Sequence, residues 1–343
     1  MLNIISIKSR IYFLLSIALL VLAFINSSQC DIIKETKSIV SISEDGSKRP
    51  GLIILSHGAP MSRWNGPVES FVDRVRELNA KEKAFHAVEG AFLEFTRPDA
   101  SSGIETLEEA GCDRIIVVPL FIAPSSHSHF DVPAVLGLYT SPDIRKTLEE
   151  EGARIAEPHV PVTITQTLDE GDILDRFCRD EVRRLSKNPA DEAIVILAHG
   201  CPDHYRLVDM MTRRVATFCC GQCGIDYADW IYCAMGQTYL EEALPALTRS
   251  GEKKKRIIVV GLYVSSSAKS IHENAMRQAS DETRMEFEKL FEKTEVVFSE
   301  AGLVEYEATA MGVLQTAIDA LNAMTVNATR HNDDNKKETS KSR

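Results

Sequence analysis

The sequence predicts an α/β protein of two duplicated lobes, each a parallel sheet with helices on both faces. First, short β-branched apolar runs alternate with stretches of helical periodicity. Second, a chain of 343 residues has the length of two ordinary domains. Third, the chain repeats itself: His57 and His199 are 142 residues apart, and the same offset places Pro119–His127 over Gly261–Lys269 without a gap.

Composition limits the class of protein. The chain is 44% hydrophobic and 26% charged, which is ordinary for a soluble protein with a sizeable core. Its net charge of −11 argues against a nucleic-acid partner.

The N-terminal segment differs in character from the rest. Lys8 and Arg10 precede an apolar run, Ile11–Ile25, and small polar residues follow it. This order predicts a secretory signal peptide over residues 1–28, followed by a linker over 29–49. The run is short for a membrane-spanning helix, which needs roughly 20 residues, but an uncleaved anchor is the alternative. We therefore expect export to the periplasm or the cell exterior, with a membrane tether if the segment is retained.

The first lobe is expected over residues 50–165. The helix after its first strand carries an apolar stripe at Val68, Phe71 and Val75. Gly111 is a natural C-cap for the next helix. The expected strands are Leu52–Leu55, Ala87–Phe95, Arg114–Phe121 and Arg154–Ala156, and the expected helices are Gly66–Asn79, Ser101–Ala110 and one near Val132–Leu138.

The second lobe is expected over residues 166–324, with the same order of elements. Its expected strands are Ala193–Leu197, Trp230–Met235, Arg256–Val264 and Val296–Ser299. Its expected helices are Asp172–Ser186, Tyr205–Phe218, Leu240–Arg249, Asp281–Lys293 and Val304–Ala323. Residues 325–343 are polar and charged and predict a disordered tail.

Histidines follow two of the buried strands in the first lobe. His57 comes directly after the first strand, and His127 ends the loop after the third. In an open α/β sheet the ligand site lies beyond the carboxyl ends of the strands, so both imidazoles are expected at one edge. Imidazole binds borderline divalent metals well. The pattern therefore indicates a divalent-metal site, against the alternative of turn histidines that satisfy backbone groups.

Three sequence blocks carry a family resemblance. They are Ile53–Gly58 (IILSHG), Val88–Phe95 (VEGAFLEF) and Val117–Phe121 (VVPLF), the last with His127 six residues before Pro133. Together they resemble the CbiX-type sirohydrochlorin chelatases, the ATP-independent class II tetrapyrrole chelatases related to ferrochelatase. The likeness runs from about residue 51 to residue 323.

The resemblance implies two flavodoxin-like lobes around a cleft and insertion of Co²⁺, Ni²⁺ or Fe²⁺ into a tetrapyrrole such as sirohydrochlorin. The metal is then a substrate, and no nucleotide is needed; the chain has no P-loop. The matching ligands are His57 and His127, and Glu94 matches the third ligand found in some relatives. A carboxylate in an apolar strand needs a partner or a cleft, and Glu94 lies at the carboxyl end; a structural hydrogen bond is its alternative. Glu89, at the other end, is expected to be structural or solvated.

The second lobe departs from the family pattern. Lys269 stands where His127 is repeated, Glu94 falls near Gln237, and His199 is the twin of His57. We interpret His199 as a relic of duplication. A second site using Cys201, His272 and Glu273 is the less favoured alternative.

Other features leave alternatives open. An exported metal- or haem-binding protein without turnover is the competing function. The chain has eight cysteines, and a thiol or metal relay on Cys220 and Cys223 is a weaker idea than a turn with a local disulfide or free thiols. Arg63 and Arg97 are placed to pair with substrate carboxylates, but surface arginines are common. The sequence does not choose the metal, the ring or the oligomeric state.

Overall fold

The structure is a computed structural model that describes residues 48–60, 62–233 and 237–341. The expected signal peptide and almost all of the expected linker lie outside the described residues. Within the described part, none of the helices combines the length and the apolar character needed to cross a membrane.

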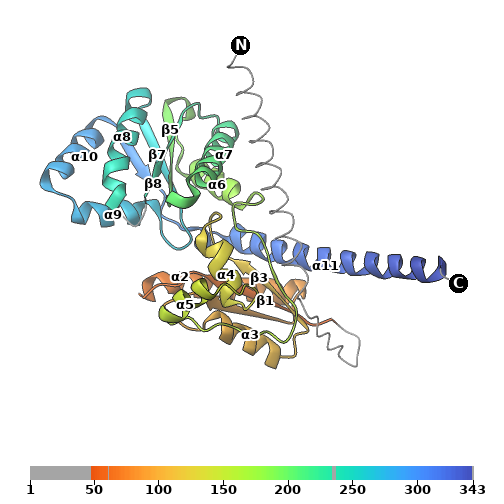
Figure 1. The fold of residues 1–343 in the computed structure, drawn as a ribbon. Helices are drawn as coiled ribbons and strands as arrows, with labels where there is room; N and C mark the ends of the chain where they lie inside the picture. Colours follow the sequence, from red (N-terminus) through yellow and green to blue (C-terminus); the bar gives the residue numbers. More distant parts are fainter. Residues whose placement is uncertain (1–47, 61, 234–236, 342–343) are drawn as a thin grey trace, which may run out of the picture. The chain divides into compact units, whose positions relative to one another are not determined.

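Two four-stranded parallel sheets form the framework (Figure 1), in the orders β2-β1-β3-β4 and β6-β5-β7-β8. The first contains β1 (Pro50–Ser56), β2 (Ala87–Phe92), β3 (Arg114–Pro119) and β4 (Val162–Ile164). The second contains β5 (Glu192–Ala198), β6 (Ala228–Tyr232), β7 (Arg256–Leu262) and β8 (Glu295–Phe298). The two orders are identical and β5 lies at the predicted offset from β1, so the predicted α/β duplication is confirmed.

Helices cover both faces of each sheet. Those of the first lobe are α2 (Ser62–Glu82), α3 (Ala100–Glu109), α4 (Val132–Val135) and α5 (Pro142–Glu150), with a π-helical turn η1 (His127–Asp131) before α4. The second part of the chain contains α6 (Ile173–Leu185), α7 (Tyr205–Cys223), α8 (Gln237–Lys253), α9 (Ala268–Gln278), α10 (Asp281–Lys293) and α11 (Glu307–Lys341). Short 3₁₀ turns are η2 (Pro189–Asp191), η3 (Pro202–His204) and η4 (Leu303–Glu305).

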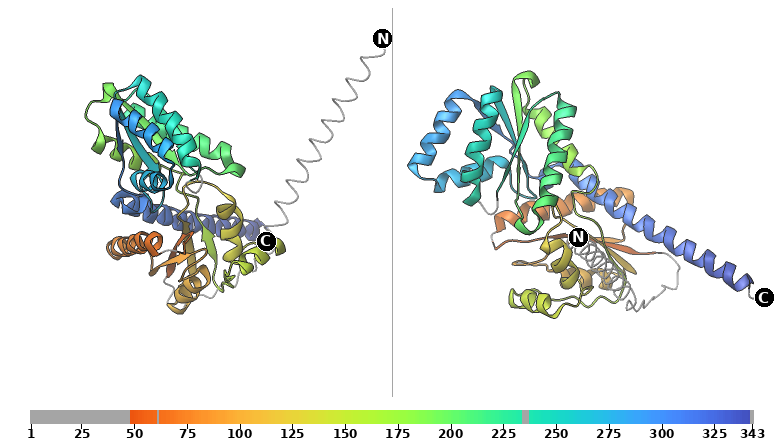
Figure 2. Two further views of the ribbon diagram at one scale, coloured as in Figure 1. Left: turned by 90° about the vertical axis from the view of Figure 1, so that its left-hand side faces the viewer. Right: turned by 45° about the horizontal axis from the view of Figure 1, so that its top comes forward.

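The lobes exchange their last helices. Helix α6 follows β4 but packs on β7 of the second sheet, and α11 follows β8 but packs on α2 and β3 of the first (Figures 1 and 2). Val313, Leu314 and Ala317 of α11 are buried in a core that also contains residues of α2 and α6. Each lobe therefore needs a helix supplied by the chain segment that follows the other sheet.

Several elements differ from the sequence expectation, and four of the differences bear on the architecture. The strand expected at Arg154–Ala156 is absent, and the edge strand is β4, whose Val-Thr-Ile sequence has high β propensity. Strand β2 ends at Phe92 because the chain turns at Phe95, which has a left-handed φ of 64°. Helix α9, not expected, begins with a capping box of Ser267 and Ser270. The expected disordered tail is helical to Lys341, since no Gly or Pro interrupts that stretch.

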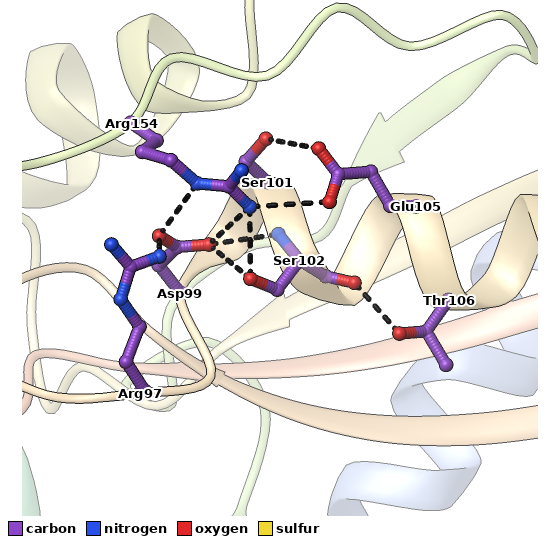
Figure 3. A network of polar contacts seen from close by, with 7 residues as sticks. All are labelled: Arg97, Asp99, Ser101, Ser102, Glu105, Thr106 and Arg154. Atoms are coloured by element: carbon purple, nitrogen blue, oxygen red, sulfur yellow. Dashed lines mark hydrogen bonds and ion pairs between the residues drawn. The ribbon is translucent and has the colours of Figure 1, made fainter.

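A polar network anchors the start of α3 (Figure 3). The buried carboxylate of Asp99 accepts hydrogen bonds from the backbone N–H of Ser102 at 2.8 Å and from its hydroxyl at 2.7 Å. Arg154 Nε donates to Asp99 at 3.1 Å, and Arg97 pairs with the same carboxylate. Arg154 also reaches Glu105 at 3.2 Å. Asp99 thus caps the helix and ties the loop after α5 to it.

We expect Asp99→Ala to lower the free energy of unfolding by about 1–2 kcal/mol. About 1 kcal/mol comes from the lost helix cap, and the partly exposed ion pairs add less. Glu105→Ala, which removes the exposed carboxylate of the same network, is the matched control and should cost under about 0.5 kcal/mol. Urea denaturation of both variants checks this; equal losses would show that the cap adds nothing beyond the surface ion pairs.

Candidate metal centre

The structure brings together the three predicted ligands. The candidate ligand atoms of His57, Glu94 and His127 all lie within 4.8 Å of one another, and no other such trio occurs among the described residues. The two imidazole rings have centroids 4.6 Å apart and planes at 84°. The Glu94 side chain is buried, whereas His127 is 40% exposed, so the site is open on one side.

Backbone geometry explains why His57 and Glu94 are neighbours. The chain leaves β1 through Gly58, which has a φ of 88°. A Cβ on Gly58 would lie 2.2 Å from the carbonyl oxygen of Glu94, so only glycine fits this turn. The backbone N–H of Glu94 donates to the carbonyl of His57 at 2.9 Å. The loops after β1 and β2 are thereby held against each other at the carboxyl edge of the sheet.

His127 is oriented by Asp131, which the sequence analysis missed. The two residues share the π-helical turn η1, and His127 Nδ1 lies 2.7 Å from Asp131 Oδ2. With the proton on Nδ1 donated to Asp131, Nε2 keeps its lone pair for a metal. The signal available in the sequence was the four-residue spacing of the two side chains in HSHFD, which places them on one face of a helical turn.

The surroundings of Glu94 and His127 shift the pKa values of these two candidate ligands. Burial raises the pKa of Glu94; the acidic groups of Glu151 and Asp131 act in the same direction, while the two histidines oppose it. The hydrogen bond to Asp131 raises the pKa of His127, against the effect of burial. A cation at the centre of the trio would provide the positive charge that the buried carboxylate lacks.

His199 is the counterpart of His57 in the second lobe. Burial lowers the pKa of His199, and the charges of His57 and His127 act in the same direction. The interpretation of His199 as a relic of duplication stays a prediction. Its position at the carboxyl end of β5 matches that of His57 on β1.

The alternative second site is not assembled in the described residues. His272 lies in an aromatic cluster: its ring stacks on Phe298 at 4.4 Å, and the hydroxyl of Tyr239 lies 2.9 Å from its Nδ1. It is a core histidine of the second lobe. Cys201 contacts His204 instead, with Sγ 3.7 Å from Nδ1.

The burial of His272 predicts a dependence of stability on pH. Desolvation lowers its pKa to about 4, below the value of about 6.5 for an unfolded chain. Between these values only the unfolded state takes up the proton, so stability is full above pH 6.5 and falls by about 3 kcal/mol as the pH drops to 4. His272→Gln should flatten this slope and His86→Gln, at an exposed site, should not. Urea denaturation at pH 5 and pH 7 measures the difference, and parallel slopes for all three proteins would refute it.

The remaining predicted residues have ordinary partners. Glu89 pairs with Arg76 at 2.9 Å, as expected of a structural residue. Lys269 pairs with Glu300 at 2.7 Å and is exposed, so it is no ligand in the second lobe. Arg63 is exposed at the start of α2, 5.7 Å from the ring of Trp64. The side chain of Gln237 lies outside the described residues.

The cysteine cluster lies in the last turns of α7 rather than in a turn after the helix. Cys219 is buried, Cys220 and Cys223 are half-buried, and all three are free thiols. Gly224 ends the helix with a left-handed φ of 70°. Burial raises the pKa of Cys220 to about 11, which disfavours the thiolate that a relay would need.

Replacing Asp131 should change both the pH dependence of Co²⁺ binding and the Co²⁺ affinity at high pH, and the two effects can be measured separately. A proton competes with metal for His127, so the raised pKa makes Co²⁺ affinity fall at a higher pH than an ordinary histidine would. In Asp131→Asn we expect this fall to shift to lower pH. At the high-pH end of the titration, affinity should be about 10–100-fold weaker in the variant because the ring loses its supporting carboxylate. Calorimetric Co²⁺ titrations from pH 5.5 to 8 test this against Asp143→Asn, an exposed control on α5; an unshifted profile would contradict it.

Fold and site together define a two-lobed α/β protein with a candidate metal-ligand trio in the first lobe. Residues 51–185 match the family model CbiX. This part of the chain is therefore similar to the CbiX family, in agreement with the resemblance that the sequence motifs indicated.

Curated relatives match part of the chain. A sirohydrochlorin cobaltochelatase of Methanococcus maripaludis is 28% identical over 92 residues, which are 27% of this chain and 61% of the relative. One from Saccharolobus solfataricus is 32% identical over 88 residues, 26% of this chain and 64% of the relative. The chain thus spans less than two thirds of the length of these relatives.

Solved structures share the fold across both lobes. SirB from Bacillus subtilis with Fe³⁺ has a TM-score of 0.57 at 15% identity and covers 80% of this chain and 98% of its own. The sirohydrochlorin chelatase SirB from Bacillus subtilis subspecies spizizenii in complex with cobalt has a TM-score of 0.51 at 14% identity, covering 79% and 96%. At these identities the likeness shows the two-lobed fold.

Proposed function

We propose that this protein is an ATP-independent metal chelatase that inserts Co²⁺ or Fe²⁺ into a tetrapyrrole such as sirohydrochlorin. The observation that carries the proposal is the convergence of His57, Glu94 and His127 at one open edge of the first sheet. The CbiX match over the same lobe supports it, as do cobaltochelatase relatives and metal-bound structural neighbours.

Three ligands hold a metal without closing its coordination shell. Two imidazoles and one carboxylate suit borderline divalent ions and leave further positions for water or for an incoming pyrrole nitrogen. The exposed side of His127 gives a macrocycle access to the metal. A closed, fully buried four-ligand site would instead retain the ion.

The same groups can take up the protons that insertion releases. Metal entry into the ring expels two pyrrole N–H protons, so the site needs bases at the moment when its ligands lose the metal. His127 has a raised pKa through Asp131, and Glu94 has a raised pKa through burial, so both bind protons readily once the metal has left.

Aromatic side chains border the ligands. Phe121 lies 6.4 Å from the rings of both histidines, and Phe95 lies 6.0 Å from His57. Phe95 is 56% exposed, which is unusual for a phenylalanine and leaves an apolar surface beside the site. We infer that a planar macrocycle packs against it and that the binding energy distorts the ring, which removes the need for ATP.

We further propose that the protein is exported and acts outside the cytoplasm. The basic residues and apolar run of segment 1–28 support this, with tethering through that run as the variant form. Fractionation of cells that make the full chain tests it; recovery in the cytosol at full length would refute export.

One assay distinguishes a chelatase from a metal- or haem-binding protein. Excess sirohydrochlorin is incubated with the protein and Co²⁺, Ni²⁺ or Fe²⁺, and absorbance follows the metallated ring. A chelatase makes many equivalents of product per chain, fastest with Co²⁺ or Fe²⁺. A binding protein stops at one equivalent and holds the finished metallo-tetrapyrrole, which would contradict our proposal.

A further inference from the structure

A second group of metal-binding side chains lies at the junction of the two lobes. Cys201 and His204 belong to the loop between β5 and α7 in the second lobe, and His129 belongs to η1 in the first. The rings of His129 and His204 stack with centroids 5.6 Å apart and planes 12° from parallel. The ligand trio of the first lobe contains none of these three residues.

The spacing of Cys201 and His204 suits a tetrahedral metal. Their Sγ and Nδ1 atoms are 3.7 Å apart. Zinc–sulfur and zinc–nitrogen bonds of about 2.3 and 2.0 Å at a tetrahedral angle place the two donors about 3.5 Å apart. The pair therefore has nearly the separation of two ligands of one ion. The turn η3 (Pro202–His204) holds them there, because His204 N–H donates to the Cys201 carbonyl at 3.2 Å.

His129 is prepared to be the third donor. Its Nδ1 lies 3.1 Å from the carbonyl oxygen of Ser125, so Nδ1 carries the proton and Nε2 keeps its lone pair. The donor atoms of the three residues do not all lie within 4.8 Å of one another as found, so binding an ion requires the exposed ring of His129 to rotate out of the stack. Cys201 is a half-buried free thiol, which keeps the position accessible to an ion.

We propose that Cys201, His204 and His129 form a second divalent-metal site that bridges the two lobes. One thiolate and two imidazoles suit Zn²⁺ or Co²⁺, with water as the fourth ligand. The ion lies beside the first centre, since His129 is two residues from His127 on the same turn. This site does not depend on the proposed insertion activity.

Cobalt spectroscopy tests the site because the first centre contains no sulfur. We expect the reduced full chain to bind Co²⁺ with a thiolate-to-cobalt charge-transfer band. The band should persist in His57→Ala/His127→Ala, at one ion per chain, and disappear in Cys201→Ser. His129→Ala should weaken the binding that gives the band by more than about tenfold.

A matched control excludes the other thiols. Cys220→Ser/Cys223→Ser removes the half-buried pair on α7 and should leave the band unchanged. A band that survives Cys201→Ser, or is lost in the control, overturns the site. Unchanged affinity in His129→Ala overturns the bridge between lobes. If the double histidine variant does not fold, the wild type and Cys201→Ser decide the question alone.

Discussion

The variant His57→Ala/His127→Ala should lose metal insertion entirely while keeping its fold. Two of the three ligands disappear, and the buried Glu94 loses both neighbouring imidazoles. We expect Co²⁺ affinity at this centre to fall at least about a thousandfold, equivalent to about 4 kcal/mol, and the insertion rate to reach the uncatalysed background. The partial exposure of both rings implies little loss of folding stability.

A matched pair of histidines provides the control. His86 and His159 are exposed residues that precede β2 and β4, at the edge of the sheet opposite the candidate centre. His86→Ala/His159→Ala makes the same chemical change and should leave both the insertion rate and Co²⁺ affinity within about twofold of the wild type. Equal insertion by the wild type and the His57/His127 variant would remove the proposed mechanism.

Ending the chain after Tyr306 should unfold the first lobe. The deletion removes the buried Val313 and Leu314 of α11 and uncovers the face of β3 and α2 on which they pack. Burial of such side chains contributes about 1.5–3 kcal/mol each, and the uncovered surface of the lobe adds a similar sum. The total is on the order of 10 kcal/mol, comparable with the whole stability of a domain.

A shorter deletion is the control for this prediction. Ending the chain after Met324 keeps the buried part of α11 and its contact with Thr163. We expect this protein to melt cooperatively within a few degrees of the wild type, whereas the chain ending at Tyr306 binds a hydrophobic dye before heating and keeps only the smaller transition of its second lobe. A transition of full amplitude without dye binding in the chain ending at Tyr306 would show that α11 is dispensable.

The sequence predicted the elements whose burial is complete. The interiors of β1, β3, β5 and β7 are continuous apolar runs because these strands are covered on both faces, so their type and approximate limits could be read directly. The edge strand β4 is half-buried and three residues long, and it left no comparable pattern. The packing of α11 on the first lobe could not be predicted from the sequence for another reason. The apolar stripe of this helix indicates that one face is buried, but it does not indicate which sheet covers that face.

The residues of the candidate site also differ in how well the sequence predicts them. His57, Glu94 and His127 could be placed from strand ends and a family motif, since parallel strands deliver their carboxyl ends to one edge. Asp131 was missed because its four-residue spacing from His127 indicates a shared face only in a helical segment, and the π-helical turn there was not predicted. The pairing of His129 with His204 joins residues from different lobes, and no local pattern links them.

The exchange of terminal helices makes the order of synthesis matter. The sheet that holds the candidate metal ligands is made first, yet its hydrophobic face stays uncovered until the final segment of the chain emerges. The first lobe is therefore synthesised first, but its core is complete only when α11 has been synthesised. Until then the face of β3 and α2 that α11 covers stays exposed, which makes an incomplete chain prone to aggregation.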